Sequence, residues 1–369
     1  MTSGDPIAAA AEGACDANGR AAVEARIAAY HDVSVSDVLS AIDYLRDPGD
    51  SVIVGGSLTL GLGNRLSDLD IVVSGNASAE SSRVPIQHWV KTLRVDVWKL
   101  RHDAMDELVQ RAERVLAGDA PVDGAFGDIF EEADLKLLHR VAFGIALDGP
   151  PLRPAARSSY REIAGDLLVR EYAERMRESA FVAQAALYAD DAIGAAFNAR
   201  LAVQSALHAT LCAHGLPFTG DKWLRERLDM DAPGLTALHE SFAVLPDDPQ
   251  HATGFVRAAL EACEALAGRD LSLTALAPQV GFDAGDLKLF PAATTYYLVS
   301  VARDALWELD EGEAQTWHAL GATPCWNCDA QDAAALKLSF QLYALGTVDL
   351  RWQRGLRVTD LAFSEGVIA

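Results

Sequence analysis

Carboxylates interrupt apolar runs that otherwise have the pattern of buried strands. The runs are Ser51–Val54, Leu69–Val73 and Leu93–Leu100, and Asp70 and Asp96 stand inside the second and third of them. Alternate residues of a strand point to opposite faces, so the valines beside Asp96 point inward while Asp96 points away from the core. A carboxylate held among apolar neighbours loses hydration unless something pairs it. This pattern restricts the fold to neighbouring strands that collect their carboxylates on one face.

Asp68 and Asp70 lie two residues apart, so on a strand both would project from the same face. Two carboxylates placed there repel each other unless a divalent cation neutralises them, and hard oxygen ligands favour Mg²⁺. Two cations about 3.5–4 Å apart can activate an attacking oxygen and stabilise a leaving pyrophosphate. We therefore predict that Asp68, Asp70 and Asp96 form the catalytic and metal-binding set, with two Mg²⁺ ions.

A glycine turn follows the first apolar run. Gly55 and Gly56 precede Ser57, and glycines after a strand permit a tight turn. A following helix N-terminus would offer free backbone N–H groups and the positive end of its dipole to phosphate oxygens, and Ser57 can add a hydroxyl donor. We expect Gly55, Gly56 and Ser57 to bind the phosphates of a nucleotide.

Together these residues resemble the signature of the DNA polymerase β-type nucleotidyltransferase superfamily. The likeness covers residues 35–100 and consists of Gly56-Ser57, Gly61, Ser67-Asp68-Leu69-Asp70 and Asp96 on a later strand. It implies a mixed sheet, Mg²⁺ at Asp68 and Asp70, a nucleoside triphosphate against Gly56-Ser57, and Asp96 as the third carboxylate. In relatives that modify small molecules, that third carboxylate can also deprotonate the acceptor hydroxyl.

The sequence departs from the superfamily's commonest form near Gly61. Many members have an arginine just before this glycine, whereas this chain has Leu60 there and Arg65 four residues beyond the glycine. We assign Arg65 to phosphate binding, with contacts arranged differently from those of the relatives. The later segment also looks similar to antibiotic-type nucleotidyltransferases, and its Lys222 beside Trp223 could reach a triphosphate or the acceptor. The other interpretation of Lys222 is a solvated lysine beside an anchoring tryptophan.

The rest of the chain predicts helices and then a small mixed unit. Residues 158–189 and 191–214 have the composition of two long alanine-rich helices, and residues 294–301, 310–320 and 333–345 indicate a strand and two helices. We expect an α/β (α+β) nucleotidyltransferase domain with a mixed sheet, then a helical bundle and a small α+β unit. The predicted boundaries are 1–30 for a helical arm, 31–150 for the nucleotidyltransferase domain, 151–268 for the helical domain and 269–369 for the C-terminal unit.

The C-terminal unit has a second resemblance. Tyr297 to Trp307, followed by Leu309-Asp310-Glu311-Gly312, faintly resembles small PqqD-like peptide-recognition domains over about 60 residues, without a catalytic signature. This likeness implies an exposed strand edge that can add a peptide strand. The alternative is a capping subdomain. Cys325-Trp326-Asn327-Cys328 lacks the partner ligands of a zinc site, so we interpret its cysteines as reduced core residues.

Charge and cysteine content limit the partners and the compartment. The chain has 369 residues, with 31 Lys and Arg against 53 Asp and Glu, and therefore a net charge of −22. Such acidity argues against a nucleic-acid polymer as partner, because binding one normally needs a basic surface. Five cysteines are few and odd in number, which favours a reducing compartment. We expect a cytoplasmic protein without a membrane span.

These features together predict an Mg²⁺-dependent nucleotidyltransferase. It would move a nucleoside monophosphate, with ATP as the expected donor of AMP, to a hydroxyl of a small molecule or peptide and release pyrophosphate. Two other classes stay open: a non-catalytic peptide- or nucleotide-binding protein, and a toxin-type nucleotidyltransferase that acts on tRNA. The first would release no pyrophosphate, and the second would need a basic surface around the cleft.

Overall fold

The computed structural model divides into two compact units. It describes residues 6–75, 84–117, 130–150, 154–277, 279–283, 285, 287–292, 295–300, 305–322, 325–327, 333–344, 348–353 and 363. The first unit takes the described residues within Met1–Pro121, Asp128–Leu168 and Gly215–Arg227, and the second takes those within Val169–His214 and Leu228–Ala369. The domain boundaries expected from the sequence remain predictions.

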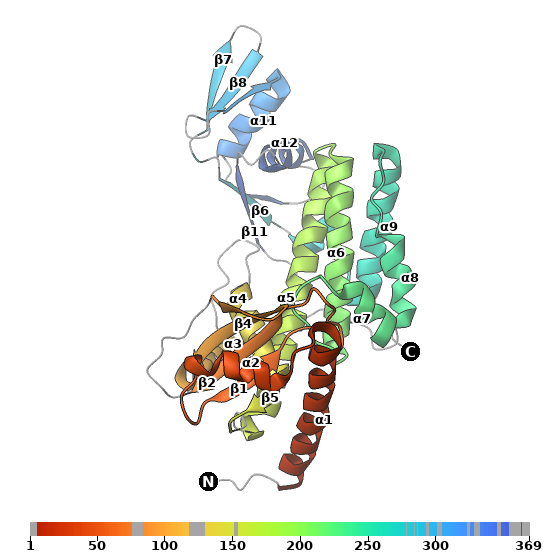
Figure 1. Ribbon diagram of the computed structural model, residues 1–369. Coiled ribbons are helices and arrows are strands. Elements are labelled where there is room, and N and C mark those ends of the chain that lie inside the picture. The colour runs from red at the N-terminus through yellow and green to blue at the C-terminus, as the bar shows by residue number, and fades with distance from the viewer. Residues whose placement is uncertain are drawn as a thin grey trace. The chain divides into compact units, whose positions relative to one another are not determined.

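A five-stranded mixed sheet forms the centre of the first unit (Figure 1), in the order β3-β4-β2-β1-β5. β1 (Ser51–Gly55) is antiparallel to β2 (Leu69–Gly75) and to β5 (Ile145–Asp148), whereas β2 is parallel to β4 (Leu93–Arg101). β3 (Ile86–Val90) pairs with β4 in an antiparallel hairpin. The three strands predicted from apolar runs are therefore neighbours, as expected. The two edge strands escaped prediction because β3 is half exposed and β5 has only four residues.

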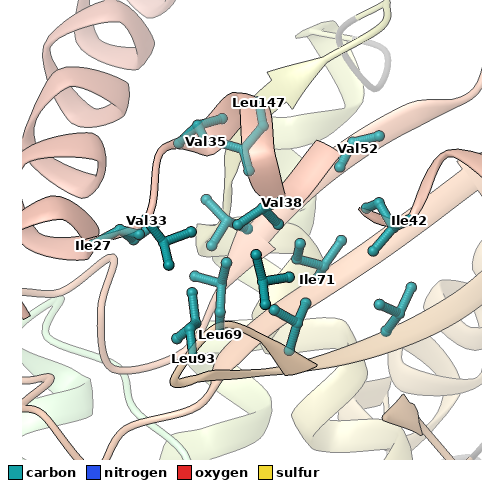
Figure 2. Packing of buried hydrophobic residues seen from close by; sticks show 14 of the residues in the cluster. Ile27, Val33, Val35, Val38, Ile42, Val52, Leu69, Ile71, Leu93 and Leu147 are labelled. Atoms are coloured by element: carbon teal, nitrogen blue, oxygen red, sulfur yellow. The ribbon is translucent and has the colours of Figure 1, made fainter. Parts of the chain in front are cut away.

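One face of this sheet is covered by α1 (Pro6–His31) and α2 (Val35–Ala41), with the 3₁₀ turn Asp43–Leu45 after α2. Apolar side chains from these helices pack against alternate residues of the strands, and Figure 2 shows Ile27, Val38, Leu69 and Ile71 among them. The alternation follows from the two-residue period of a strand. Burying this apolar cluster gives the unit its main stabilisation.

The opposite face carries α3 (His102–Ala117) and α4 (Glu132–Phe143). α4 packs against β1 and β2, and α3 packs against β4 and α4. An ion pair between Arg111 and the buried Asp134 joins the two helices. α4 ends at Phe143, and Ile145 already begins β5.

The second unit begins with a helical region. α5 (Pro154–Tyr188) belongs to the first unit up to Leu168 and to the second from Val169. α6 (Ala192–Ala213) and α9 (Pro249–Ala267) pack closely through buried alanines, because small side chains let helix backbones approach. Two shorter helices are α8 (Pro233–Ser241) and α10 (Leu273–Leu276), and α7 (Leu224–Asp231) belongs to the first unit up to Arg227 and to the second from Leu228. Among the described helices, none combines the length and apolar character that crossing a membrane requires.

Two small sheets and two helices follow. The sheets have the orders β10-β6-β11 and β7-β8-β9. Their strands are β6 (Gln279–Asp283), β7 (Lys288–Ala292), β8 (Thr295–Ser300), β9 (Ala305–Leu309), β10 (Cys325–Asn327) and β11 (Asp349–Gln353), and the helices are α11 (Glu311–Ala322) and α12 (Ala333–Ala344). The expected fold class is confirmed: a mixed-sheet α+β domain, a helical region and a small unit of sheets and helices. Cys328 lies outside the described residues.

Candidate active site

Asp68, Asp70 and Asp96 lie toward the sheet face opposite the core cluster. In the parallel pairing of β2 with β4, Asp70 stands directly opposite Asp96, and in the pairing of β1 with β2 it stands opposite Gly55. The valines on either side of Asp96 belong to the core cluster on the other face. Asp68 lies in the loop just before β2 rather than on the strand. The structure therefore brings the three carboxylates together, as the sequence predicts.

Two arginines contact these carboxylates. Nη2 of Arg94 contacts Oδ2 of Asp68 and lies 3.3 Å from Oδ2 of Asp96. Nη2 of Arg140, from α4, lies 3.0 Å from Oδ1 of Asp70. Three negative charges are thus matched by two positive charges, and the cluster retains an excess negative charge.

The same imbalance is reflected in the pKa values of the carboxyl groups. Burial raises the pKa of Asp70 above its ordinary value, Arg140 opposes this, and the carboxylates of Asp68 and Asp96 raise it further. Burial likewise raises the pKa of Asp96, against the opposing effect of Arg94 and with a further increase from Asp68. Desolvation and like-charge repulsion therefore both disfavour the ionised forms, and an additional cation would relieve both.

The donor chemistry of this cluster fits a divalent ion. In the described part of the chain, no group of three or more His, Cys, Asp or Glu residues has the arrangement of a formed metal site. Oδ1 of Asp96, however, is buried and has no hydrogen-bond partner among the described residues. Carboxylate oxygens are the ligands that Mg²⁺ prefers, and an unsatisfied buried oxygen is costly without a partner. The residues therefore suit Mg²⁺, although arginine contacts now occupy several of their oxygens.

The glycine turn approaches the carboxylates closely. Gly56 has a φ of 76°, and a Cβ built on it would overlap Oδ2 of Asp70. A Cβ on Gly55 would lie 2.9 Å from the Cβ of Arg140. Gly56 therefore meets two requirements that other residues do not: a left-handed backbone and space for the Asp70 carboxylate.

The expected helix after Ser57 is wrong. The structure describes every residue between β1 and β2, and residues 57–61 form consecutive turns. The backbone N–H groups of Leu62 and Gly63 both donate to the carbonyl of Ser57, at 3.0 and 3.2 Å. These bonds close the loop on Ser57, and glycines at 61 and 63 disfavour a helix there. Any phosphate contact at this loop would come from turn N–H groups and the Ser57 hydroxyl, not from a helix end.

Arg26 of α1 also fixes this loop. Its Nη1 donates to the carbonyl of Leu58 at 2.7 Å and lies 3.5 Å from that of Thr59. The hydroxyl of Thr59 in turn donates to the carbonyl of Gly56 at 2.7 Å. The loop after β1 is therefore held by specific hydrogen bonds at several points.

Lys222 lies on a segment that packs against this loop within the first unit. Phe218 and Trp223 form a buried cluster with Leu62, and Leu60 packs against it. His139 of α4 anchors the segment, because its Nε2 lies 3.3 Å from the carbonyl of Pro217. Burial lowers the pKa of His139 to about 4, so the neutral ring donates this bond through Nε2–H. The apolar contact also explains Leu60, where many relatives have an arginine.

Lys222 and Arg65 are both exposed, and their predicted nucleotide contacts remain predictions. Nζ of Lys222 lies 5.2 Å from the centre of the Trp223 ring, the anchoring tryptophan of the alternative interpretation. Arg65 lies near enough to His31, at the end of α1, for its charge to contribute, after burial, to lowering the pKa of that histidine. Arg94 and Arg140 contact the carboxylates of the site instead.

Sequence reasoning did not find Arg94 and Arg140. Arg94 lies two residues before Asp96 on the same strand, so the two-residue period offered a signal that both share a face. Arg140 comes from α4, far along the chain from Asp70, and no local pattern points to their contact. Its position depends on how α4 packs on the sheet.

Comparisons with known proteins gave one family match and matches to solved structures. Residues 38–118 match the family described as "Nucleotidyltransferase domain", and this segment contains Gly56, Asp68, Asp70 and Asp96. A solved structure described as a nucleotidyltransferase-like protein from Exiguobacterium sibiricum 255-15 matches 63% of this chain and 77% of that chain, at 12% identity and a TM-score of 0.35. No curated protein was found to match the chain. Residues 38–118 thus form a nucleotidyltransferase domain, and the chain carrying it is a transferase that acts on a nucleotide substrate.

Proposed function

We propose that this chain transfers a nucleoside monophosphate, with ATP as donor of AMP, to a hydroxyl group of a small molecule or peptide and releases pyrophosphate. The observation that carries the proposal is the gathering of Asp68, Asp70 and Asp96 beside Gly56, whose missing side chain leaves room for a carboxylate. The raised pKa values of Asp70 and Asp96 also support the proposal, because perturbed carboxyl groups gather at functional sites.

Asp68, Asp70 and Asp96 would hold two Mg²⁺ ions. When bound, these ions would neutralise triphosphate charge and stabilise the leaving pyrophosphate. The chain's own groups would orient the nucleotide through Gly55, Gly56 and Ser57, with Arg65 and Lys222 as further phosphate ligands. In this role Ser57 would donate its hydroxyl proton to a phosphate oxygen.

Asp96 is the proposed base. Its buried Oδ1 has no hydrogen-bond partner among the described residues, so it can accept the proton of an acceptor hydroxyl. Its raised pKa favours proton uptake more than an ordinary aspartate would. The hydroxyl oxygen would then attack the α-phosphorus, and the bond from that phosphorus to the pyrophosphate oxygen would break.

The test is an incubation of the protein with each NTP, Mg²⁺ and a cell extract. Pyrophosphate release is measured, and mass spectrometry identifies the molecule that gains a nucleotide. Asp68→Asn should lower transfer at least about 1,000-fold, with an unchanged circular dichroism spectrum. Asp103→Asn is the matched control, because Asp103 is an exposed aspartate paired with Arg101 at the far end of β4.

Each outcome separates the functions considered. Turnover that survives Asp68→Asn would refute the assignment of the carboxylates. Nucleotide binding without pyrophosphate would favour a binding protein, and a nucleotide adduct on tRNA would favour the toxin-type enzyme.

A cavity in the second unit bears on the acceptor. It has a volume of about 410 Å³ and lies beside β9, which in the described chain pairs with β8 alone. Its apolar lining includes Trp307, Leu309 and Leu338, and its acidic lining includes Asp191, Glu308 and Glu313. An edge strand beside such a cavity suits an extended basic peptide, which supports a peptide as acceptor or ligand. Glu308→Lys, which reverses one exposed acidic charge of this lining, should then weaken peptide binding while pyrophosphate release with a small acceptor stays unchanged.

A further inference from the structure

The two arginines of the carboxylate cluster are held very differently. The guanidinium of Arg140 lies 4.0 Å from the centre of the Trp98 ring, and 16% of its side chain is exposed. Arg94 has 40% of its side chain exposed. Arg140 is thus fixed between an aromatic face and the carboxylate of Asp70, whereas the side chain of Arg94 has solvent available to it.

Arg94 also contacts carboxylate oxygens that would bind a metal ion. A single nitrogen, Nη2, contacts Oδ2 of both Asp68 and Asp96. Nε of Arg94 and Oδ1 of Asp96 are buried and have no hydrogen-bond partner in the part of the chain that the structure describes. Arg94 therefore neutralises this pair of carboxylates without satisfying either itself or Asp96.

A divalent ion and Arg94 compete for the same position. An ion bound between Asp68 and Asp96 would stand beside the guanidinium, and two cations a few ångströms apart repel each other. Since Arg94 is partly exposed, it can move its charge into solvent when such an ion binds. Arg140, stacked on Trp98, has no comparable freedom.

Resting on the proposed function, we propose that Arg94 is a displaceable internal cation that holds Asp68 and Asp96 together in the metal-free protein and must leave before Mg²⁺ binds them. This competition lowers the affinity for Mg²⁺ alone. A nucleotide bound nearby adds negative charge and favours the exchange, so that metal binding is coupled to nucleotide binding. Arg94 is in this sense a positioning residue.

The experiment is a calorimetric titration of the protein with MgCl₂ in the absence of nucleotide. Arg94→Gln should bind Mg²⁺ several-fold to about tenfold more tightly than the wild type, because the competing charge is gone. Arg94→Lys should stay close to the wild type. The matched control is Arg101→Gln, since Arg101 is an exposed arginine on the same strand with its own partner, Asp103, and its loss should leave the Mg²⁺ affinity unchanged.

Thermal unfolding in EDTA provides a second readout. Without Arg94 the carboxylates of Asp68 and Asp96 repel each other, so Arg94→Gln should unfold at a lower temperature than the wild type and gain more from added Mg²⁺. An Mg²⁺ affinity of Arg94→Gln equal to or below that of the wild type would overturn the proposal. If the wild type transfers a nucleotide but Arg94→Gln does not bind Mg²⁺ more tightly, only the inference about Arg94 is overturned. Tighter Mg²⁺ binding by Arg94→Gln without transfer by the wild type would overturn the proposed function alone.

Discussion

Both units of the molecule bury charged side chains, but they pair them in different ways. In the second unit, Arg177 is fully buried on α5, and its Nη1 lies 2.8 Å from Oε2 of Glu174 one turn away. On the same helix, Arg175 pairs with the buried Glu171 at 2.9 Å. In the first unit, three carboxylates from two strands and a loop share two cations, Arg94 and Arg140, which come from a strand and a helix.

The difference separates charges that hold a fold from charges that are available for chemistry. Pairs from one helix place a cation beside an anion on the same element, so removing one partner leaves the other charge buried and lowers stability. Three carboxylates on two cations leave negative charge that an additional cation or a bound proton can neutralise. A surplus of buried charge is therefore a better guide to a site than the number of buried charges.

The strongest test of this comparison is Arg177→Met. We expect a loss of about 3–5 kcal/mol, because the carboxylate of Glu174 stays buried while its ion pair with Arg177 is gone. The measurement is thermal or denaturant unfolding. The double variant Arg177→Met with Glu174→Leu should recover most of this loss, since both charges are then absent. A single variant as stable as the wild type would show that this pair does not support the fold.

A second test concerns the close approach of the glycine turn to Asp70. Gly56→Ala should cost about 1–3 kcal/mol, because the residue has a positive φ and the new methyl group would overlap the carboxylate. Transfer should fall as well. Gly49→Ala is the matched control: Gly49 has a φ of 96°, but no atom lies within 4 Å of an added Cβ. If Gly56→Ala and Gly49→Ala lose the same free energy of unfolding, the loss in Gly56→Ala comes from backbone strain and not from overlap with the Asp70 carboxylate.

The smallest expected effect has the opposite sign. Asp96→Asn should raise the free energy of unfolding of the metal-free protein by about 1 kcal/mol, or a few degrees in Tm, because it removes a buried charge that lacks full compensation. It should at the same time abolish transfer. If Asp96→Asn has a lower Tm than the wild type in EDTA, the three carboxylates do not carry an uncompensated negative charge in the metal-free protein.

The pH dependence of the same variant gives a check on this explanation. The folded-state pKa of Asp96 is raised, so the folded protein takes up this proton before the unfolded chain does as the pH falls. The cost of the buried charge is therefore present above the raised pKa and is relieved between it and the ordinary value near 3.8. As the pH falls over that range, the difference in Tm between Asp96→Asn and the wild type should therefore shrink. Asp103→Asn should have the opposite effect on Tm. Arg101 lowers the pKa of Asp103, so the ionised carboxylate stabilises the folded protein and its loss should lower Tm.

Much of the five-stranded sheet could be predicted from the sequence because its signals are local. Apolar runs predict β1, β2 and β4, and the position of Asp96 between two valines predicts which face it occupies. The edge strands β3 and β5 lack such runs. The turn after Ser57 resembled a helix start, but the carbonyl of Ser57 receives bonds from Leu62 and Gly63 instead, a closure that the glycine pattern does not specify.

The sequence by itself determined the three carboxylates, the glycine beside them and the strands that carry them, because a two-residue period and a short spacing are local properties of the chain. Only the tertiary structure decided which cations meet those carboxylates. Arg140 reaches Asp70 because α4 packs on β1 and β2, and Lys222 lies near the loop because Phe218 and Trp223 bury themselves against Leu62. Contacts between segments so far apart depend on how whole faces pack, and that is set by the entire core rather than by any one stretch of sequence.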